Sequence, residues 1–470
     1  MKTVSTIEPG AVQGFLRDLV QVDQPRLQHP GFDAIAEEIH LLGIEPGRPV
    51  MVAMPNGRQF ITVVLALLAH GAVPVLLPPS APPSRIERMA HALGADALIA
   101  PRIPPELHNG EMPRIISPSA QLVFLREVQV RHCRPGEIIL LTSGTSGVFS
   151  GCLHRVESLL LNAARHVQAI GQTAADTVLI NLPMHYSYAF VAQMLGTFAL
   201  GGKAVIAGPP FTPSRYARTI QDHQVTVSSL TPAMVDSWRL TGQKLPVPLR
   251  RLTVGGSALE ASCVADVLER NPGLELYLTY GLTEAGPRVS TLAAHLEPPE
   301  RYASVGLPLP GVRTRLRTAN PGDKVGELIV KTDTGMLRRI GWRDAPLSLV
   351  GDTKTLVSTG DLFEMDDEGY LFFRNRRPSY MISRGEKVCL KSVCTIAETI
   401  PEVAGAQAWT HQNAAGDIVF TLDVYCEDVD SVDDRELRRR LAKYLLRCEQ
   451  PAHVLIHPAS QLGWRKSVVA

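Results

Sequence analysis

Cysteine is scarce in this 470-residue sequence, and neither sign of charge is in excess. The seven cysteines are odd in number and scattered, with no C-x-x-C pair, which argues against a disulfide framework or a zinc site and predicts reduced thiols in the cytoplasm. Lys and Arg total 47 against 46 for Asp and Glu, a net charge of +1. This balance weighs against a nucleic-acid partner and against a polybasic membrane anchor.

Long apolar runs are also few. Residues 60–79 are nearly long enough to span a bilayer, but Gly71 and Pro74 interrupt the run. We therefore expect a buried helix followed by a short strand, and no membrane span. The first residues lack the basic start and apolar core of a signal peptide.

Apolar segments alternate with amphipathic ones from about residue 138 to residue 279. The alternation predicts an α/β fold with a large N-terminal domain of layered α/β sub-domains and mainly parallel sheets. We expect strands at 138–142, 177–182, 204–207, 225–230, 252–255 and 274–279, and helices at 158–170, 190–200, 216–223 and 262–270.

Beyond Glu284 the pattern changes to a β ribbon, with a turn at residues 366–369. The basic stretch at 374–378 then separates a small α+β C-terminal domain from the large body. The predicted boundaries are 1–374 for the large domain, 375–380 for a hinge linker and 381–470 for the small domain.

A loop rich in Thr, Ser and Gly follows the first of these strands, within the segment LTSGTSGVFSG at 141–151. Glycines let the backbone approach an anion, and hydroxyl and N–H groups donate to phosphate oxygens. The Walker pattern is excluded because its G-K-[ST] ending is absent. By itself the segment is either a phosphate loop or an ordinary polar turn. The residues concerned are Thr142, Ser143, Gly144, Thr145, Ser146 and Gly147.

Further polar segments accompany other predicted strands: GGSAL at 255–259, YGLTE at 280–284 and STGDL at 358–362. Open α/β sheets bind ligands at strand ends. A tyrosine can stack on a base, a glutamate can hold Mg²⁺, an aspartate can bind ribose hydroxyls and an arginine can hold phosphate. Taken singly, each residue also has a plain structural interpretation, with Tyr280 in the core and Glu284, Asp361 and Arg376 as surface charges.

The order and spacing of these segments resemble the adenylate-forming superfamily of acyl-CoA synthetases, luciferases and peptide-synthetase adenylation domains. The resemblance runs from about Phe32 to the end of the chain and suggests a degenerate aryl-CoA-ligase-like member. It implies two half-reactions, formation of acyl-AMP from a carboxylate and ATP and then transfer to a thiol, with a small domain that is mobile between them. By resemblance, residues 142–147 form the phosphate loop, Gly255, Gly256 and Ser257 the adenine side, Tyr280 the base contact, Thr283 a phosphate contact, Glu284 the Mg²⁺ ligand, Asp361 the ribose ligand and Arg376 a further nucleotide contact.

The resemblance also implies an acyl pocket around the segment LPMHYSY at 182–188, and a thiol tunnel shaped by Gly385 and Lys387. Residues 185–195 contain no carboxylate that could anchor an α-ammonium group. The aromatic residues instead favour a small aryl acid, such as a benzoate or anthranilate. The expected pocket residues are His185, Tyr186, Tyr188, Ser257, Ala258, Tyr280 and Gly281.

The chain departs from the family pattern at three positions. Ser150 and Trp464 stand where the family has lysines, and Pro378 stands at the hinge, where its fixed φ favours one pose of the small domain. We expect that pose to be the thiol-delivering one. Adenylation joins two anions, and losing one preorganised donor typically costs about 2.7–4 kcal/mol. We therefore expect little or no synthesis of acyl-AMP.

From this we predict an acyltransferase, which moves a small aryl group from a coenzyme A thioester to the phosphopantetheine of an acyl carrier protein in secondary metabolism. The catalytic candidates are His185, Thr283 and Glu284. His185 either handles a proton or contacts an oxyanion, since an ordinary imidazole pKa suits both, or it is only a pocket wall. Cys152 either carries an acyl group or is a packing residue.

Two alternatives remain open. The first is an ATP-dependent ligase that joins an aryl or other acyl acid to CoA or a carrier protein through acyl-AMP, with Arg465 or Lys466 replacing the lysine. The second is a non-catalytic nucleotide-binding pseudoenzyme. Coenzyme A thioester is the expected cofactor in the main interpretation, with AMP or ATP and Mg²⁺ in the alternatives.

Overall fold

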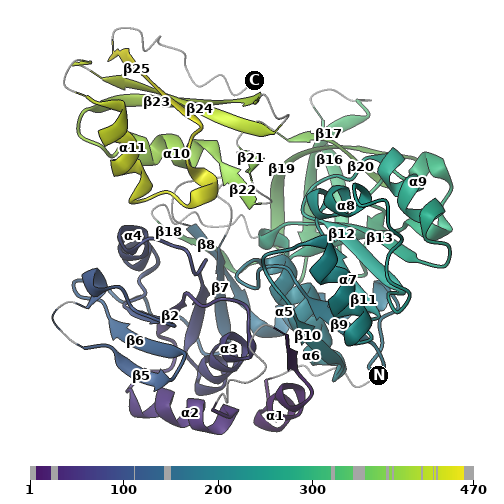
Figure 1. Ribbon diagram of the computed structural model, residues 1–470, viewed down its shortest axis with the longest axis horizontal. Coiled ribbons are helices and arrows are strands. Elements are labelled where there is room, and N and C mark those ends of the chain that lie inside the picture. Colours follow the sequence, from purple (N-terminus) through teal and green to yellow (C-terminus); the bar gives the residue numbers. More distant parts are fainter. Residues whose placement is uncertain are drawn as a thin grey trace.

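The computed structural model shows a large body of stacked sheets and helices, with the last part of the chain packed above one side of it (Figure 1). Mixed α/β architecture was predicted from the alternation of segments and is confirmed. The structure describes residues 7–22, 30–108, 110, 112–141, 150–318, 323–341, 355–376, 380–383, 386–413, 417–426, 428–429 and 432–459.

The first eight-stranded sheet has the order β18-β8-β7-β3-β2-β4-β6-β5. Its central strands are buried along their whole length, so they appear in the sequence as short continuous apolar runs. The strands are β2 (Pro49–Val52), β3 (Val73–Leu76), β4 (Ala97–Ala100), β5 (Arg114–Ser117), β6 (Ala120–Phe124), β7 (Glu137–Leu141), β8 (Ser150–Arg155) and β18 (Arg338–Gly341).

The apolar run at 60–79 forms a buried helix and then a strand, as predicted. Helix α3 (Arg58–His70) ends at Gly71, whose φ of 89° is readily available only to glycine. Among the described residues, no helix is long and apolar enough to cross a membrane. Helices α1 (Pro9–Arg17), α2 (Phe32–Leu41) and α4 (Pro83–Leu93) complete this part of the chain.

The second eight-stranded sheet has the order β1-β10-β9-β11-β12-β13-β14-β15 and is parallel from β1 to β13. Its strands are β1 (Val20–Gln21), β9 (Thr177–Ile180), β10 (Lys203–Ile206), β11 (Val227–Leu230), β12 (Arg251–Gly255), β13 (Glu275–Gly281), β14 (Arg288–Ala293) and β15 (Leu307–Pro308). Its helices are α5 (Val156–Ala169), α6 (Gly196–Leu200), α7 (Pro213–Asp222), α8 (Pro232–Arg239) and α9 (Ala261–Arg270).

One predicted helix, 190–200, differs from expectation. The segment Tyr188–Leu195 is a π-helix that leads into α6, and all but its first residue are buried. π-Helical turns are rare and frequently occur at functional sites. This helix starts within the segment predicted to line the acyl pocket.

The β ribbon expected after Glu284 is a four-stranded sheet of β16 (Arg313–Arg317), β17 (Val325–Thr332), β19 (Thr355–Met365) and β20 (Leu371–Arg376). The predicted turn at 366–369 joins its last two strands, where the Gly369 N–H donates to the Asp366 carbonyl over 3.0 Å. The C-terminal elements are β21 (Tyr380–Ser383), β22 (Glu386–Cys389), α10 (Leu390–Ala397), β23 (Val403–Gln412), β24 (Ile418–Cys426), α11 (Asp434–Ala442) and β25 (His453–Pro458).

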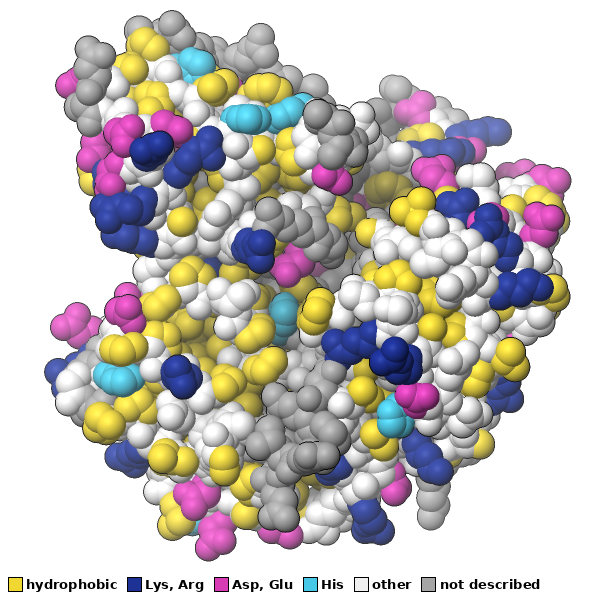
Figure 2. Space-filling model, in the orientation of Figure 1, with side chains coloured by type: hydrophobic (Ala, Val, Ile, Leu, Met, Phe, Trp, Pro, Cys, Tyr) yellow, Lys and Arg dark blue, Asp and Glu magenta, His cyan; other side chains and the backbone are white. Residues whose placement is uncertain are grey.

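Helix α4 of the body contacts the C-terminal elements directly. Arg85 forms an ion pair with Glu449, and the Arg88 guanidinium carbon lies 4.2 Å from the centre of the Tyr444 ring. A continuous apolar cluster also joins the first sheet to α10, α11 and β24. Figure 2 shows hydrophobic side chains along the hollow where these two parts meet.

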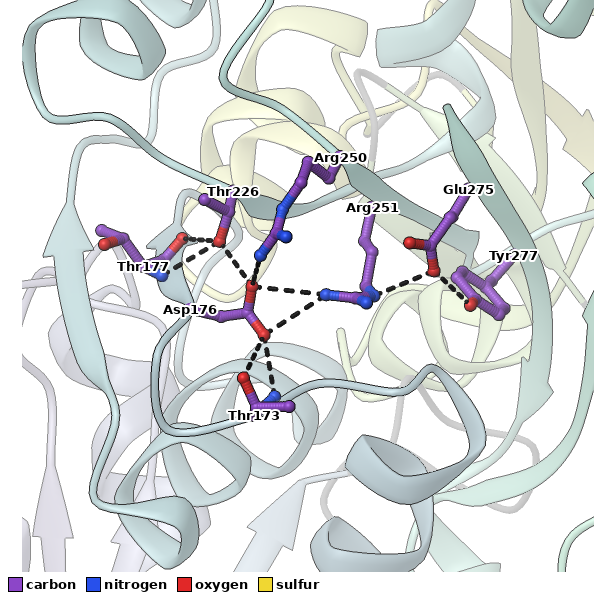
Figure 3. A network of polar contacts seen from close by, with 8 residues as sticks. All are labelled: Thr173, Asp176, Thr177, Thr226, Arg250, Arg251, Glu275 and Tyr277. Atoms are coloured by element: carbon purple, nitrogen blue, oxygen red, sulfur yellow. Dashed lines mark hydrogen bonds and ion pairs between the residues drawn. The ribbon is translucent and has the colours of Figure 1, made fainter. Parts of the chain in front are cut away.

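A polar network around the buried Asp176 joins the amino ends of the strands in the second sheet (Figure 3). The Asp176 carboxylate, with no exposed surface, accepts hydrogen bonds from Thr173, Thr226 and Arg250 at 2.7–3.1 Å and from Arg251 at 3.3 Å. Burial by itself would raise the pKa of Asp176, but these hydrogen bonds outweigh it, and the pKa lies below its ordinary value. The network fixes strands β9, β11 and β12 to one another.

Candidate functional site

The opposite, carboxyl ends of these strands hold the residues predicted from the sequence. β13 ends in Tyr280 and Gly281, and the Tyr280 hydroxyl donates to Asp361 Oδ2 over 2.7 Å although the two residues are 81 positions apart. The Tyr280 ring packs edge-on against Phe363, with 4.8 Å between ring centres. The structure thus brings together an aromatic face and a carboxylate at the end of the sheet.

Thr283 and Glu284 follow directly in a short 3₁₀ turn, Thr283–Ala285. The Thr283 hydroxyl is 2.9 Å from the Ser187 hydroxyl, which connects this turn to the segment at 182–188. Glu284 is 9% exposed, and its Oε1 accepts a hydrogen bond from Arg339 Nη2 over 2.8 Å. Glu284 is therefore held by a cation from β18, in the other large sheet.

His185 lies at a cavity of about 500 Å³ whose walls include Asn56, Phe60 and Pro183. The Asn56 side chain fixes the segment by bonding the Leu182 carbonyl over 2.7 Å and the Met184 N–H over 2.8 Å. Burial lowers the pKa of His185 to about 3, and its Nε2 has no hydrogen-bond partner among the described residues. The assumption of an ordinary imidazole pKa was wrong, because a buried imidazole stays neutral at physiological pH.

Tyr188 faces the sheet. Its hydroxyl is 3.0 Å from the Thr253 hydroxyl, and the guanidinium carbon of the buried Arg288 lies 3.6 Å from its ring centre. A Cβ on Gly255 would lie 2.5 Å from the Thr279 hydroxyl and 3.2 Å from the Tyr188 ring, so only glycine fits at this strand end.

The remaining predicted pocket residues lie at strand ends on the surface. Ser257 and Ala258 are exposed beyond β12, as is Gly256, a residue predicted for the adenine side, whose φ is 97°. Gly281 is exposed beyond Tyr280, and a Cβ there would lie 2.3 Å from the Pro287 carbonyl oxygen. These four residues are exposed, whereas His185 is buried and Tyr188 is partly buried.

β22 of the C-terminal part reaches the same segment. The Tyr186 hydroxyl donates to Glu386 Oε2 over 3.1 Å, and Cys448 Sγ lies 3.2 Å from the same oxygen. Burial and the nearby Glu386 carboxylate raise the pKa of Tyr186 well above its ordinary value, so its hydroxyl remains a donor. Glu386 adjoins Gly385 and Lys387, the residues predicted to shape a thiol tunnel.

Several predicted residues lie outside the described part of the structure, wholly or in their side chains. The backbones of Ser150 and Arg376 pair with Gly341 and Asp361, and Lys387 pairs with Ile382. The residues wholly outside are Thr142, Ser143, Gly144, Thr145, Ser146, Gly147, Pro378, Gly385, Trp464, Arg465 and Lys466.

No motif in the sequence marks Arg339, because it reaches the site through the pairing of distant strands. Glu386 lies between Gly385 and Lys387, which were predicted to shape the thiol tunnel, but its contact with Tyr186 was not predicted. Cys152 is fully buried, and burial, followed by the nearby Glu284, raises its thiol pKa well above the ordinary value. This supports the packing interpretation of Cys152, since the thiolate is the reactive form.

Residues 32–338, well over half of the chain, match the family of AMP-binding enzymes. The chain belongs to this family. The resemblance to the adenylate-forming superfamily, with an aryl-CoA-ligase-like character, is confirmed.

Among curated relatives, this AMP-binding enzyme is 28% identical to a 2-succinylbenzoate–CoA ligase of Bacillus cytotoxicus, over 77% of this chain and 74% of the relative. Among solved structures, it superposes on the o-succinylbenzoate CoA synthetase of Bacillus subtilis, a double mutant bound with a product analogue. That match has a TM-score of 0.79 at 19% identity and covers 96% of this chain and 95% of the other. The same synthetase with its acyl-adenylate intermediate gives a TM-score of 0.66 at 20% identity, covering 96% and 94%.

The predicted acyl transfer from a CoA thioester to an acyl carrier protein is wrong. The similar proteins are ligases, and the Bacillus subtilis enzyme was solved with an acyl-adenylate and with ATP and magnesium ion. The prediction gave decisive weight to the lysines missing at Ser150 and Trp464, and kept the ligase, with Arg465 or Lys466 in place of the lysine, only as an alternative. Neither an acyltransferase nor a carrier-protein partner is supported. The chain is an enzyme of the adenylate-forming superfamily.

Proposed function

We propose that this protein is an ATP-dependent acid–thiol ligase that activates a small aryl acid as its acyl-adenylate and transfers the acyl group to coenzyme A. The observation that carries the proposal is the convergence of Tyr280, Asp361, Thr283 and Glu284 around the carboxyl end of β13, where the Thr283 hydroxyl also lies 2.9 Å from the Ser187 hydroxyl of the segment at 182–188. The curated ligases support the reaction class.

The nucleotide would bind at the Tyr280 end. The Tyr280 ring offers a face for adenine stacking, and Asp361, held by the Tyr280 hydroxyl, offers acceptors for ribose hydroxyls. Burial of Asp361, at 2% exposure, strengthens such hydrogen bonds because little water competes for them.

Magnesium fits the residues present. Among the described residues, no cluster of three or more His, Cys, Asp or Glu side chains would hold a metal by itself. Mg²⁺ commonly binds one or two carboxylates together with substrate phosphates, and Glu284 supplies one carboxylate at the site. The ion would add positive charge to the phosphates when bound with the nucleotide.

The aryl group would occupy the cavity at His185. In the first step, a carboxylate oxygen of the acid forms a bond to the α-phosphorus as the bond to pyrophosphate breaks. In the second, the CoA sulfur bonds to the acyl carbon, the bond to AMP breaks, and the thiol proton leaves. His185, neutral because of its low pKa, can donate a hydrogen bond to the acyl oxygen but is a weak base.

The arrangement of the C-terminal elements fits the second step. Glu386 contacts Tyr186 of the acyl segment, and the fold superposes better on the product-analogue complex than on the acyl-adenylate complex. We propose that this is the thiol-transferring pose and that residues 375–380 are the hinge. The predicted roles of Pro378, Gly385 and Lys387 belong to this proposal.

The proposal is tested by exchange of labelled pyrophosphate into ATP, with benzoates, anthranilate and 2-succinylbenzoate as a panel of acids. We expect exchange that depends on one class of acid, and acyl-CoA when coenzyme A is added. Acyl-CoA formation without ATP, or no exchange with any acid, would overturn the proposal.

A further inference from the structure

Strand β8 begins at Ser150, where the resemblance places a phosphate-contacting lysine. Adenylation brings a carboxylate against a triphosphate, so a ligase needs fixed positive charge near the start of β8. Strand β18 lies directly alongside β8 and contributes two arginines, Arg338 and Arg339.

The strand register determines where Arg339 lies. β18 runs antiparallel to β8, with Arg339 opposite Cys152 and Gly341 opposite Ser150. Directly opposed residues of an antiparallel pair project to the same face, so Arg339 shares a face with Cys152, while Arg338 projects to the other. Arg339 is thus two strand positions from the residue that faces Ser150.

The chain before β18 is fastened to the turn that carries Glu284. The Met336 N–H donates to the Glu284 carbonyl over 2.9 Å, and the Thr334 hydroxyl donates to the Ala285 carbonyl over 3.1 Å. These two hydrogen bonds fix the chain just before Arg339 relative to the site, independently of the ion pair between Arg339 and Glu284.

The ion pair then places the guanidinium itself. Arg339 Nη2 lies 2.8 Å from Glu284 Oε1, and the two side chains are 15% and 11% exposed. A guanidinium has five N–H donors along two edges, so it can bind a carboxylate and a phosphate together. Low exposure makes its charge more effective than that of a solvated surface cation.

We propose that Arg339 is a polyphosphate-binding residue, which supplies from β18 the positive charge that Ser150 does not supply from β8. Its ligand is the pyrophosphate part of ATP, bound as the leaving group of adenylation. This inference rests on the proposed ligase function and adds a residue to the adenylation half-reaction.

The test compares Arg339→Gln with Arg338→Gln, a matched loss of charge one residue away on the other face of β18. Calorimetry measures binding of inorganic pyrophosphate with Mg²⁺, and two assays separate pyrophosphate exchange from CoA transfer using synthetic acyl-AMP. For Arg339→Gln we expect weaker pyrophosphate binding and exchange slower by about 10²–10³-fold. CoA transfer from acyl-AMP should stay near the unsubstituted rate, and Arg338→Gln should resemble the unsubstituted protein.

Arg339→Lys is the control for misfolding. It keeps the positive charge but lacks the planar guanidinium group. We expect its pyrophosphate affinity to lie between those of the unsubstituted protein and Arg339→Gln. Unchanged pyrophosphate affinity in Arg339→Gln, or an equal loss in both half-reactions, would show a purely structural role. If the unsubstituted protein makes no acyl-AMP from any acid, the ligase proposal fails, and the pyrophosphate affinities still decide the role of Arg339.

Discussion

Asp176 and Glu284 are both buried carboxylates bound by arginine, and they lie at opposite ends of the same sheet. Asp176, at the amino ends of the strands, accepts from two threonine hydroxyls, a backbone N–H and two arginines. Glu284, beyond the carboxyl end of β13, forms one ion pair within the described part of the chain, with Arg339. The carboxylate that is surrounded by donors is placed to stabilise the sheet, whereas the carboxylate that pairs with one arginine of the described residues, at a strand end, is suited to ligand binding.

Substituting Glu284 by Gln tests the functional end and should have the largest effect. The variant keeps the size of the side chain but removes its charge, so we expect pyrophosphate exchange to fall by about 10²–10³-fold. The free energy of unfolding should change less than it does in Asp176→Asn. If Glu284→Gln loses stability but exchanges pyrophosphate at the unsubstituted rate, Glu284 has a structural role and the assignment of this end to function is wrong.

Substituting Asp176 by Asn tests the structural end. Removing one partner of a buried charge pair typically costs about 3–5 kcal/mol, because the remaining charges are left uncompensated. We expect the lower half of that range, since Arg250 is 55% exposed. Denaturant unfolding measures the loss, and the exchange rate of the folded variant, assayed in parallel, should stay at the unsubstituted level.

Acid should lower the free energy of unfolding in two separate pH ranges, one set by buried histidines and the other by Asp176. Burial lowers the pKa of His154 to about 4 and of His166 and His185 to about 3, from an ordinary value of 6.5. The unfolded chain therefore binds more protons, and stability falls as the pH drops from about 6.5 toward 4, by up to about 1.4 kcal/mol per pH unit for each histidine.

The contribution of Asp176 to stability is lost at a lower pH than that of the histidines. Its folded pKa lies below the ordinary 3.8, so its contribution is complete above that value and is lost as the pH falls further. Unfolding measured from pH 7 to pH 3 should show that His185→Gln flattens the upper part of the curve. Asp176→Asn should lower the free energy of unfolding by a nearly constant amount above the ordinary pKa of 3.8, and should change the slope of the curve only below it. Identical curves for the two variants would contradict the separation.

The smallest effect is expected from a pair of tyrosines, one at each end of β13. Tyr280→Phe removes the hydrogen bond to Asp361, and a bond to a charged group is worth about 1.5–3 kcal/mol. We expect the KM for ATP to rise roughly tenfold. Tyr277→Phe removes the matching bond to Glu275 at the amino end and should leave that KM unchanged.

Much of the fold was predictable because its signals are local. The buried run at 60–79 and the alternation between 138 and 279 follow from apolar spacing and from residues such as Gly71 that end helices. The π-helix at Tyr188–Leu195 was not predictable, because its apolar sequence also suits an ordinary helix.

The site was predictable only where a motif of the resemblance marks its residues. Tyr280, near the end of β13, and Asp361, within β19, were each assigned to the nucleotide by their motifs, and the structure joins them by a hydrogen bond. Arg339 could not be predicted as a site residue, because its position depends on the register of β18 against β8. The sequence around Arg339 carries no signal of that pairing. The contact between Glu386 and Tyr186 could not be predicted for the same reason, because the two residues are far apart in the chain.

The most direct test of the ligase account follows an oxygen atom. The purified protein is given ATP, coenzyme A and the acid selected by pyrophosphate exchange, labelled with ¹⁸O in its carboxylate, and the nucleotide product is analysed by mass spectrometry. Attack of the carboxylate on the α-phosphorus predicts one ¹⁸O atom in AMP. Acyl-CoA formed together with unlabelled AMP, or with ADP as the product, would contradict the account.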